Sequence, residues 1–142
     1  MSTHYIPKEV RQAVAKTARY RCGYCQTQAA VIGMPLEIEH IMPVSLGGTV
    51  NPDNLWLSCT LCNRYKGNQV TGFDELTNAM VSLFNPRQQK WNDHFAWEQQ
   101  GLMIVGLTST GRATIFRLQM NNPFVVRSRA IWISWGWHPP KD

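Results

Sequence analysis

Four cysteines stand in two C-x2-C pairs, Cys22 with Cys25 and Cys59 with Cys62. Each pair presents two sulfurs at a spacing that suits one tetrahedral Zn2+, and two pairs complete a closed shell of four thiolates. A shell without an open position is typical of a structural metal site. Between the pairs lie 33 residues, 26–58, more than the usual zinc-ribbon interval. We therefore expect this loop to carry a site of its own.

A disulfide framework is the alternative use of four cysteines, and it requires an oxidising compartment. The first 20 residues contain no apolar stretch of the signal-peptide type. No stretch of the chain approaches the length of a membrane span. The expectation is therefore a soluble, cytoplasmic protein without a membrane partner, in which the cysteines bind zinc.

Length and composition favour one domain, 1–142, with a real hydrophobic core. The apolar content is 44%, including six Trp and five Phe. The formal net charge of +5 favours a polyanionic partner, although charge alone concerns nonspecific attraction. Nucleic acid is the expected partner.

The elements that must position this loop are predicted from Pro, Gly and hydrophobic spacing. In the first half we expect a helix over 7–19, strands over 36–41 and 55–57, and a helix from near Cys59 to Gly67. On that last helix Asn63 directly follows Cys62 and is rotated by about 100° around the helix axis. One helix face can therefore bind zinc, and the neighbouring face can contribute to a second site.

The second half shows fewer residues with an evident chemical role. We expect a helix over 71–84, a hairpin that turns near Gln100-Gly101, and helices over 111–120 and 123–135, the last contested by β-branched residues. His94 is expected to pack among aromatic side chains. Five tryptophans are expected in the core rather than as platforms for unstacked bases beside Arg127 and Arg129: Trp91, Trp97, Trp132, Trp135 and Trp137.

The order Glu39-His40, Asn54, Asn63 between the two Cys pairs resembles the ββα-metal motif of HNH endonucleases over residues 38–68. The first Cys pair resembles the zinc-stapled variety of that motif. Segments 83–97 and 106–132 look like the tail of a standalone bacterial HNH subfamily. The resemblance implies an α+β fold: a zinc-stapled, treble-clef-like HNH core over 1–72 with an N-terminal helix, and a mixed C-terminal extension over 73–142.

What the resemblance implies chemically is hydrolysis of a DNA phosphodiester bond by one metal ion. His40 would be the general base, because an imidazole with a pKa of about 6.5 can accept a proton from water. Glu39 and Asn63 would hold the ion, and their oxygens suit Mg2+ or Mn2+. Asn54 would tie the loop between the strands. The resemblance also implies that two side chains hold a phosphate: Lys66 and Arg64.

Some alternatives stay open at this point. In a regular strand Glu39 and His40 point to opposite faces, so they share a site only if the strand ends, twists or bulges there. Glu37 is interpreted as a solvent-facing carboxylate rather than a partner within the site. The alternative functions are a noncatalytic zinc-stabilised module that binds nucleic acid and a zinc domain that binds protein. The expected state is a monomer or a weak dimer.

Overall fold

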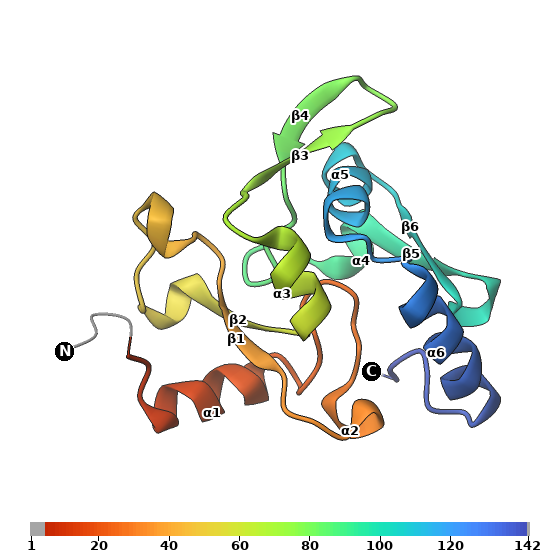
Figure 1. Cartoon of the computed structure of the whole chain (residues 1–142), viewed down its shortest axis with the longest axis horizontal. Coiled ribbons are helices and arrows are strands. Elements are labelled where there is room, and N and C mark those ends of the chain that lie inside the picture. Colours follow the sequence, from red (N-terminus) through yellow and green to blue (C-terminus); the bar gives the residue numbers. More distant parts are fainter. Residues whose placement is uncertain (1–4, 142) are drawn as a thin grey trace.

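Residues 5–141 are described by a computed structural model, in which short helices lie between and beside three separate two-stranded antiparallel sheets (Figure 1). This mixture is the expected α+β class. Within the described residues no helix is long and apolar enough to cross a membrane.

The first sheet is a hairpin of β1, Glu37–His40, and β2, Leu55–Ser58, with Glu39 opposite Trp56 and His40 opposite Leu55. Helix α1, Lys8–Thr17, covers one face of this hairpin (Figure 1). The apolar residues between them form a small core of Ile6, Val14 and Leu55, with Val10, Ile38 and Val50 beside it. Both predicted strands and the predicted N-terminal helix are therefore confirmed.

Helix α3, Thr60–Lys66, packs against β1 and begins directly after β2. The Cys59 sulfur accepts a hydrogen bond from the backbone N–H of Cys62, so it caps the helix. The helix ends at Gly67, whose φ of +55° lies in the left-handed region that favours glycine. This confirms the predicted helix between Cys59 and Gly67.

The first cysteine loop, residues 22–25, packs closely on β2. Gly23 donates from its backbone N–H to the carbonyl oxygen of Leu57 at 2.8 Å. A Cβ atom at Gly23 would lie 2.3 Å from Cδ1 of Trp56, so no larger residue fits there without a shift. Helix α2, Ala29–Ile32, follows the loop before the chain enters β1.

The prediction of a helix over 71–84 is wrong, because this segment forms a second hairpin. Strand β3, Thr71–Asp74, pairs with β4, Ala79–Ser82. Asn78 takes a φ of +56° at the turn, and the Thr77 hydroxyl donates to Asp74. The buried Asp74 carboxylate also accepts two hydrogen bonds from Arg112, at 2.9 and 3.0 Å, which the local sequence could not reveal.

Replacing Asp74 with Asn is expected to make the stability of the protein less sensitive to acid. The hydrogen bonds from Arg112 hold the pKa of Asp74 well below its ordinary value. A depressed carboxyl pKa stabilises the fold above the unfolded pKa of about 3.9, and this contribution is lost as the pH falls towards the folded pKa. Thermal unfolding between about pH 7 and about pH 2 measures the effect. The exposed Asp53, changed to Asn, is the control; parallel curves for Asp74→Asn and wild type would contradict the prediction.

The remaining elements complete the C-terminal half. The expected hairpin is present as β5, Phe95–Glu98, and β6, Met103–Gly106, joined through Gln99–Gly101 and preceded by α4, Trp91–His94. Helix α5, Ser109–Leu118, packs on β3, β4, β6 and α3 (Figure 1). Helix α6, Pro123–Ser134, is capped by the Asn122 side chain, which accepts from the N–H of Val125. The contested helix is confirmed.

The aromatic predictions are only partly right. Trp91 and Trp97 pack against the main hydrophobic core, and Trp132 is half-buried. Trp135 and Trp137 are instead 68% and 51% exposed, where their rings stack on one another. His94 packs edge-on against Phe84, as expected, and its Nδ1 lies 2.7 Å from the Thr108 hydroxyl.

Candidate functional site

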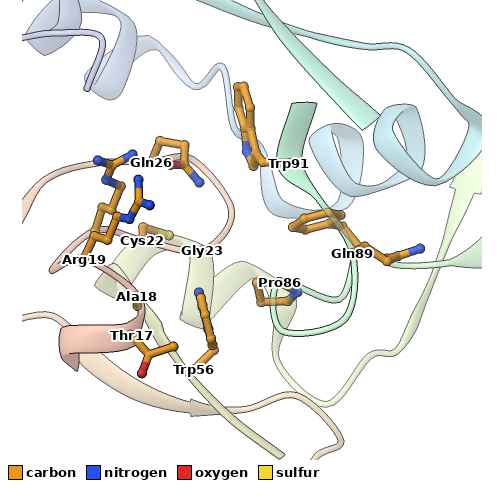
Figure 2. A pocket seen from close by; sticks show the side chains of 12 residues that line it. Thr17, Ala18, Arg19, Cys22, Gly23, Gln26, Trp56, Pro86, Gln89 and Trp91 are labelled. Atoms are coloured by element: carbon orange, nitrogen blue, oxygen red, sulfur yellow. The ribbon is translucent and has the colours of Figure 1, made fainter. Parts of the chain in front are cut away.

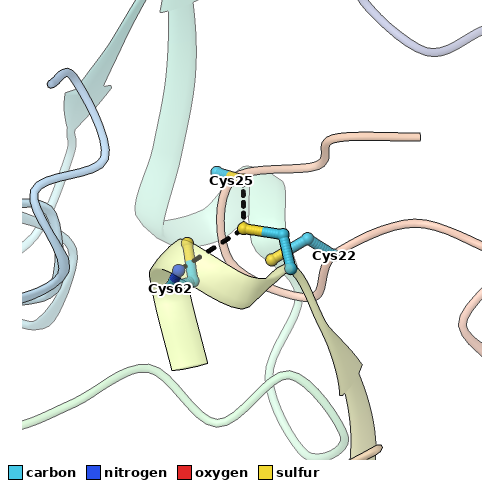
Figure 3. A group of neighbouring side chains, drawn as sticks. Cys22, Cys25 and Cys62 are labelled. Carbon is cyan, nitrogen blue, oxygen red and sulfur yellow. Dashed lines mark hydrogen bonds between the residues drawn. The ribbon is translucent and has the colours of Figure 1, made fainter. Parts of the chain in front are cut away.

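The four cysteine sulfurs converge on one point between the first cysteine loop and the start of α3. All four lie within 4.8 Å of one another. Figure 3 shows the labelled sulfurs of Cys22, Cys25 and Cys62 turned toward one another. Sulfurs placed 2.3 Å from a tetrahedral Zn2+ would stand about 3.8 Å apart. The cysteines form no disulfide, and the cluster is positioned to hold a metal ion in a manner consistent with zinc.

Burial gives this cluster the character of a structural metal site. Cys22, Cys25 and Cys62 are buried, and Cys59 is partly buried. Desolvation raises the pKa of Cys22, whereas hydrogen bonds with Cys22 and then Cys59 lower the pKa of Cys25. Thiolates are the metal-binding form, so metal uptake must release protons from the thiols that are still protonated.

Glu39 lies on the face of β1 that meets α3, and it is buried. Its side chain is only 2% exposed. The Tyr24 hydroxyl donates to Oε2 at 2.6 Å, and the Lys66 ammonium lies 2.7 Å from Oε1. Burial raises the pKa of Glu39, while the positive charge of Lys66 and the hydrogen bonds from Lys66 and Tyr24 oppose that rise. The carboxylate is therefore held on both oxygens.

Lys66 joins α3 to the end of β1. Its Nζ donates to the carbonyl oxygens of His40 and Ile41, at 3.3 and 3.0 Å, besides its ion pair with Glu39. The side chain is 3% exposed. In this arrangement Lys66 fixes the backbone at the strand end. The sequence led us to expect an ammonium that faces a phosphate, whereas here the ammonium is enclosed by protein atoms.

Asn63 and Glu37 form a second pair between α3 and β1. The Asn63 side-chain N–H donates to Oε1 of Glu37 at 2.8 Å. Hydrogen bonds from Thr60, and then Asn63, lower the pKa of Glu37, so this carboxyl is ionised near neutral pH. The interpretation of Glu37 as merely solvent-facing is wrong, because it is half-buried and bonded to a predicted site residue. Its position two residues before Glu39, on the same strand face, was the signal available in the sequence.

His40 is the last residue of β1 and is half-buried. Strand alternation places it on the face opposite Glu39, so these two side chains approach a common site only where the strand ends. The structure ends the strand at His40, as the sequence suggested. Its carbonyl oxygen is held by Lys66, which fixes the backbone that carries the imidazole.

Asn54 ties together the loop that connects β1 to β2. Its Oδ1 accepts from the N–H of Met42 at 2.8 Å, and its Nδ2 donates to the carbonyl oxygens of Met42 and Thr49, at 3.0 and 2.9 Å. These bonds have the geometry that a loop-tying residue requires. Arg64 projects from α3 as an exposed cation near Glu37.

A cleft runs beside the end of β1. The HNH-like segment lines it with residues that include Met42, Asn54 and Lys66, and the second half of the chain lines it with residues that include Ser82 and Gln88. The two halves therefore share a concave, partly polar surface beside Ile41 and Met42, the residues that follow His40 in the chain. The side chain of Lys66 reaches this cleft although it is almost fully buried.

A different pocket opens between the first cysteine loop and the segment before α4 (Figure 2). Arg19, Gln26, Trp56 and Trp91 are among its lining residues. Unlike the cleft beside β1, which includes Asn54 and Lys66, this pocket has none of the predicted catalytic or phosphate-binding residues among the described residues of its lining. This pocket is therefore separate from the candidate site.

Comparison with known proteins supports the assignment of this segment. Residues 22–69, about a third of the chain, match the family model described as HNH endonuclease. The match spans both cysteine pairs and every predicted site residue, which confirms the resemblance seen in the sequence. No curated protein matches the chain.

Proposed function

Given an HNH endonuclease segment over residues 22–69, we propose that this protein is a metal-dependent endonuclease that hydrolyses DNA phosphodiester bonds. The family match is the observation that carries the proposal. Support comes from the net charge of +5, which favours a polyanionic substrate. In this proposal residues 1–72 form the catalytic HNH core, and residues 73–142 form an extension that lines the adjacent cleft.

His40 is the proposed general base. Abstraction of a proton from water requires a group that is partly neutral at cellular pH and held within hydrogen-bond reach of that water. One feature of the structure supports this role: Asn54 holds the loop that directly follows His40 through three hydrogen bonds. The backbone next to the imidazole is therefore held in place.

Glu39 and Asn63 are the proposed ligands of a Mg2+ or Mn2+ ion, which when bound would neutralise charge on the phosphate and the departing 3′ oxygen. Their carboxylate and amide oxygens are hard donors. Oε1 of Glu39 already accepts a cation, the Lys66 ammonium at 2.7 Å, so the carboxylate fits a positive partner. Asn63 bonds Glu37 through Nδ2, so Oδ1 would be the atom it offers to the ion, whereas Oε1 of Glu39 would have to give up its Lys66 partner.

The two proposed phosphate contacts differ in what they require. Arg64 is exposed on α3 and can meet a phosphate as it stands. The Lys66 ammonium is enclosed by Glu39 and two carbonyl oxygens, so it could meet a phosphate only if it moved away from them. Both side chains supply cations that suit phosphate oxygens.

The chemistry of the cleaved ends tests the proposal. The zinc-loaded protein is incubated with an end-labelled DNA duplex in Mg2+ or Mn2+, and the products are resolved beside size standards of known termini. Loss of the 3′ oxygen as leaving group predicts 3′-hydroxyl and 5′-phosphate ends. If DNA and RNA stay intact with every divalent ion but still bind the protein at low salt, the result would favour the noncatalytic binding module instead.

Replacing Asn54 with Ala is expected to slow cleavage by about 10- to 100-fold, because displacement of a catalytic group by about 1 Å can cost that much. The variant loses the three hydrogen bonds that hold Met42 and Thr49. Single-turnover rates at saturating metal ion measure the effect. Asn68→Ala, an exposed position just after α3, is the matched control. Equal rates for Asn54→Ala and wild type would show that the loop needs no such tie.

A further inference from the structure

Tyr24 occupies an unusual place, between the two cysteines of the first pair. Its side chain is fully buried, with 0% of its surface exposed. The cysteines that flank it bring their sulfurs to the four-sulfur cluster. The Trp91 indole N–H, from the C-terminal extension, donates to the Tyr24 carbonyl oxygen at 2.7 Å. The backbone of Tyr24 is thus held by the cysteine loop and by the second half of the chain.

The hydroxyl of Tyr24 reaches out of the cysteine loop to the strand that carries the candidate site. It donates to Oε2 of Glu39 at 2.6 Å, across the interior of the protein. In this contact the phenolic O–H is the donor and the carboxylate oxygen the acceptor. Oε2 is therefore occupied by a neutral donor, while Oε1 is paired with the Lys66 ammonium at 2.7 Å.

We propose that Tyr24 is a positioning residue: it fixes Oε2 of the Glu39 carboxylate and so orients Oε1, which here pairs with Lys66, for the catalytic divalent ion that would take the place of that ammonium. The inference rests on the proposed function, because it assumes that Glu39 is a ligand. Hydrogen bonds to ligating carboxylates commonly alter metal affinity by about 10- to 100-fold. Since Tyr24 stands between two cysteines, the same bond makes the placement of Glu39 depend on the zinc-holding loop.

Packing alone is the competing explanation for a buried tyrosine. Tyr24→Phe separates the two, since it keeps the ring within the core and removes one oxygen atom. A packing role predicts unchanged affinity for the divalent ion. The positioning role predicts weaker affinity for the divalent ion while the zinc content stays complete, because the substitution changes only how the Glu39 carboxylate is oriented.

The experiment uses the full-length, zinc-loaded protein and Mn2+ as the probe, with free Mn2+ followed by electron paramagnetic resonance. Tyr24→Phe should weaken Mn2+ binding by about 10- to 100-fold and raise the Mn2+ concentration for half-maximal nicking in parallel. The rate at saturating Mn2+ should recover to within about threefold of wild type. Tyr20→Phe, an exposed position before the loop, is the matched control and should bind Mn2+ as wild type does.

A second variant shows whether the effect passes through Glu39. In a double-mutant cycle, Tyr24→Phe should add nothing once Glu39 is changed to Gln. Equal Mn2+ affinity in Tyr24→Phe and wild type, no Mn2+ binding by wild type, or loss of zinc from Tyr24→Phe would each overturn the inference. If wild type cleaves nothing but the Mn2+ shift is found, the positioning role stands and the proposed function fails. If wild type cleaves DNA and Tyr24→Phe binds Mn2+ as tightly as wild type, the proposed function stands and the positioning role fails.

Discussion

The variant His40→Ala is expected to cleave DNA about 10²- to 10⁴-fold more slowly than wild type at saturating Mg2+, the usual contribution of a general base. His40 lies at the end of β1 and is half-buried, so its removal should leave the hairpin and the zinc site intact. Zinc content, circular dichroism and affinity for DNA should therefore match wild type. Single-turnover cleavage of a labelled duplex measures the rate.

A second histidine provides the control for that experiment. His94 packs against Phe84 and bonds Thr108 in the C-terminal half, and we assign it no part in the chemistry. His94→Gln should therefore cleave at close to the wild-type rate. If His40→Ala cuts DNA as fast as His94→Gln, His40 has no part in the mechanism. Other residues would then have to account for the nuclease activity.

Removal of zinc is expected to unfold the N-terminal half of the protein. The sulfurs lie in the same buried cluster as Tyr24, Phe84 and Phe95, so the metal joins the first cysteine loop, α3 and the main core. Structural zinc binds with about 10–16 kcal/mol in small zinc modules. That is as large as the about 5–15 kcal/mol by which a whole domain is stable, so the chain without zinc should not keep this fold.

Circular dichroism during titration with a strong zinc chelator tests this prediction, with released zinc measured in parallel by a chromogenic dye. One zinc per chain should leave as the helical signal falls, and Cys62→Ser should bind zinc more weakly than wild type. Addition of Mg2+ should not restore the signal, because Mg2+ prefers oxygen ligands. An unchanged spectrum after all zinc has left would mean that packing alone holds the core together.

The sequence predicts well those elements whose signals are local, in the HNH-like segment and in helix α6. The C-x2-C spacing, the left-handed Gly67 and the start signal at Asn122-Pro123 each act within a few residues of the element that they define. Helix α6 shows this clearly. Its β-branched residues favour a strand, but Asn122 caps the first turn and Pro123 suits it, so the segment is helical.

The errors arise where distant contacts decide the structure. The hairpin at 71–82 depends on Asp74, whose partner Arg112 lies 38 residues further along the chain. The five tryptophans look alike in the sequence, yet only the packing of α6 and the C-terminal segment shows that Trp135 and Trp137 are exposed.

The contacts within the candidate site also depend on residues that are distant in the sequence. Glu37 and Glu39 share one strand face, and the sequence alone does not tell which carboxylate meets which residue of α3. The packing of α3 against β1 pairs Glu37 with Asn63 and Glu39 with Lys66. The contact from Tyr24 to Glu39 crosses from the cysteine loop to the strand, and the spacing of the motif gives no sign of it.

Plasmid nicking across divalent ions tests the central proposal most directly. Wild type and His40→Ala, both zinc-loaded, are incubated side by side with supercoiled plasmid and Mg2+, Mn2+ or no added ion. The proposal predicts nicked circles from wild type with Mg2+ or Mn2+, none without an added ion, and almost none from His40→Ala. Plasmid that stays supercoiled under every condition, or is nicked equally by both proteins, would contradict it.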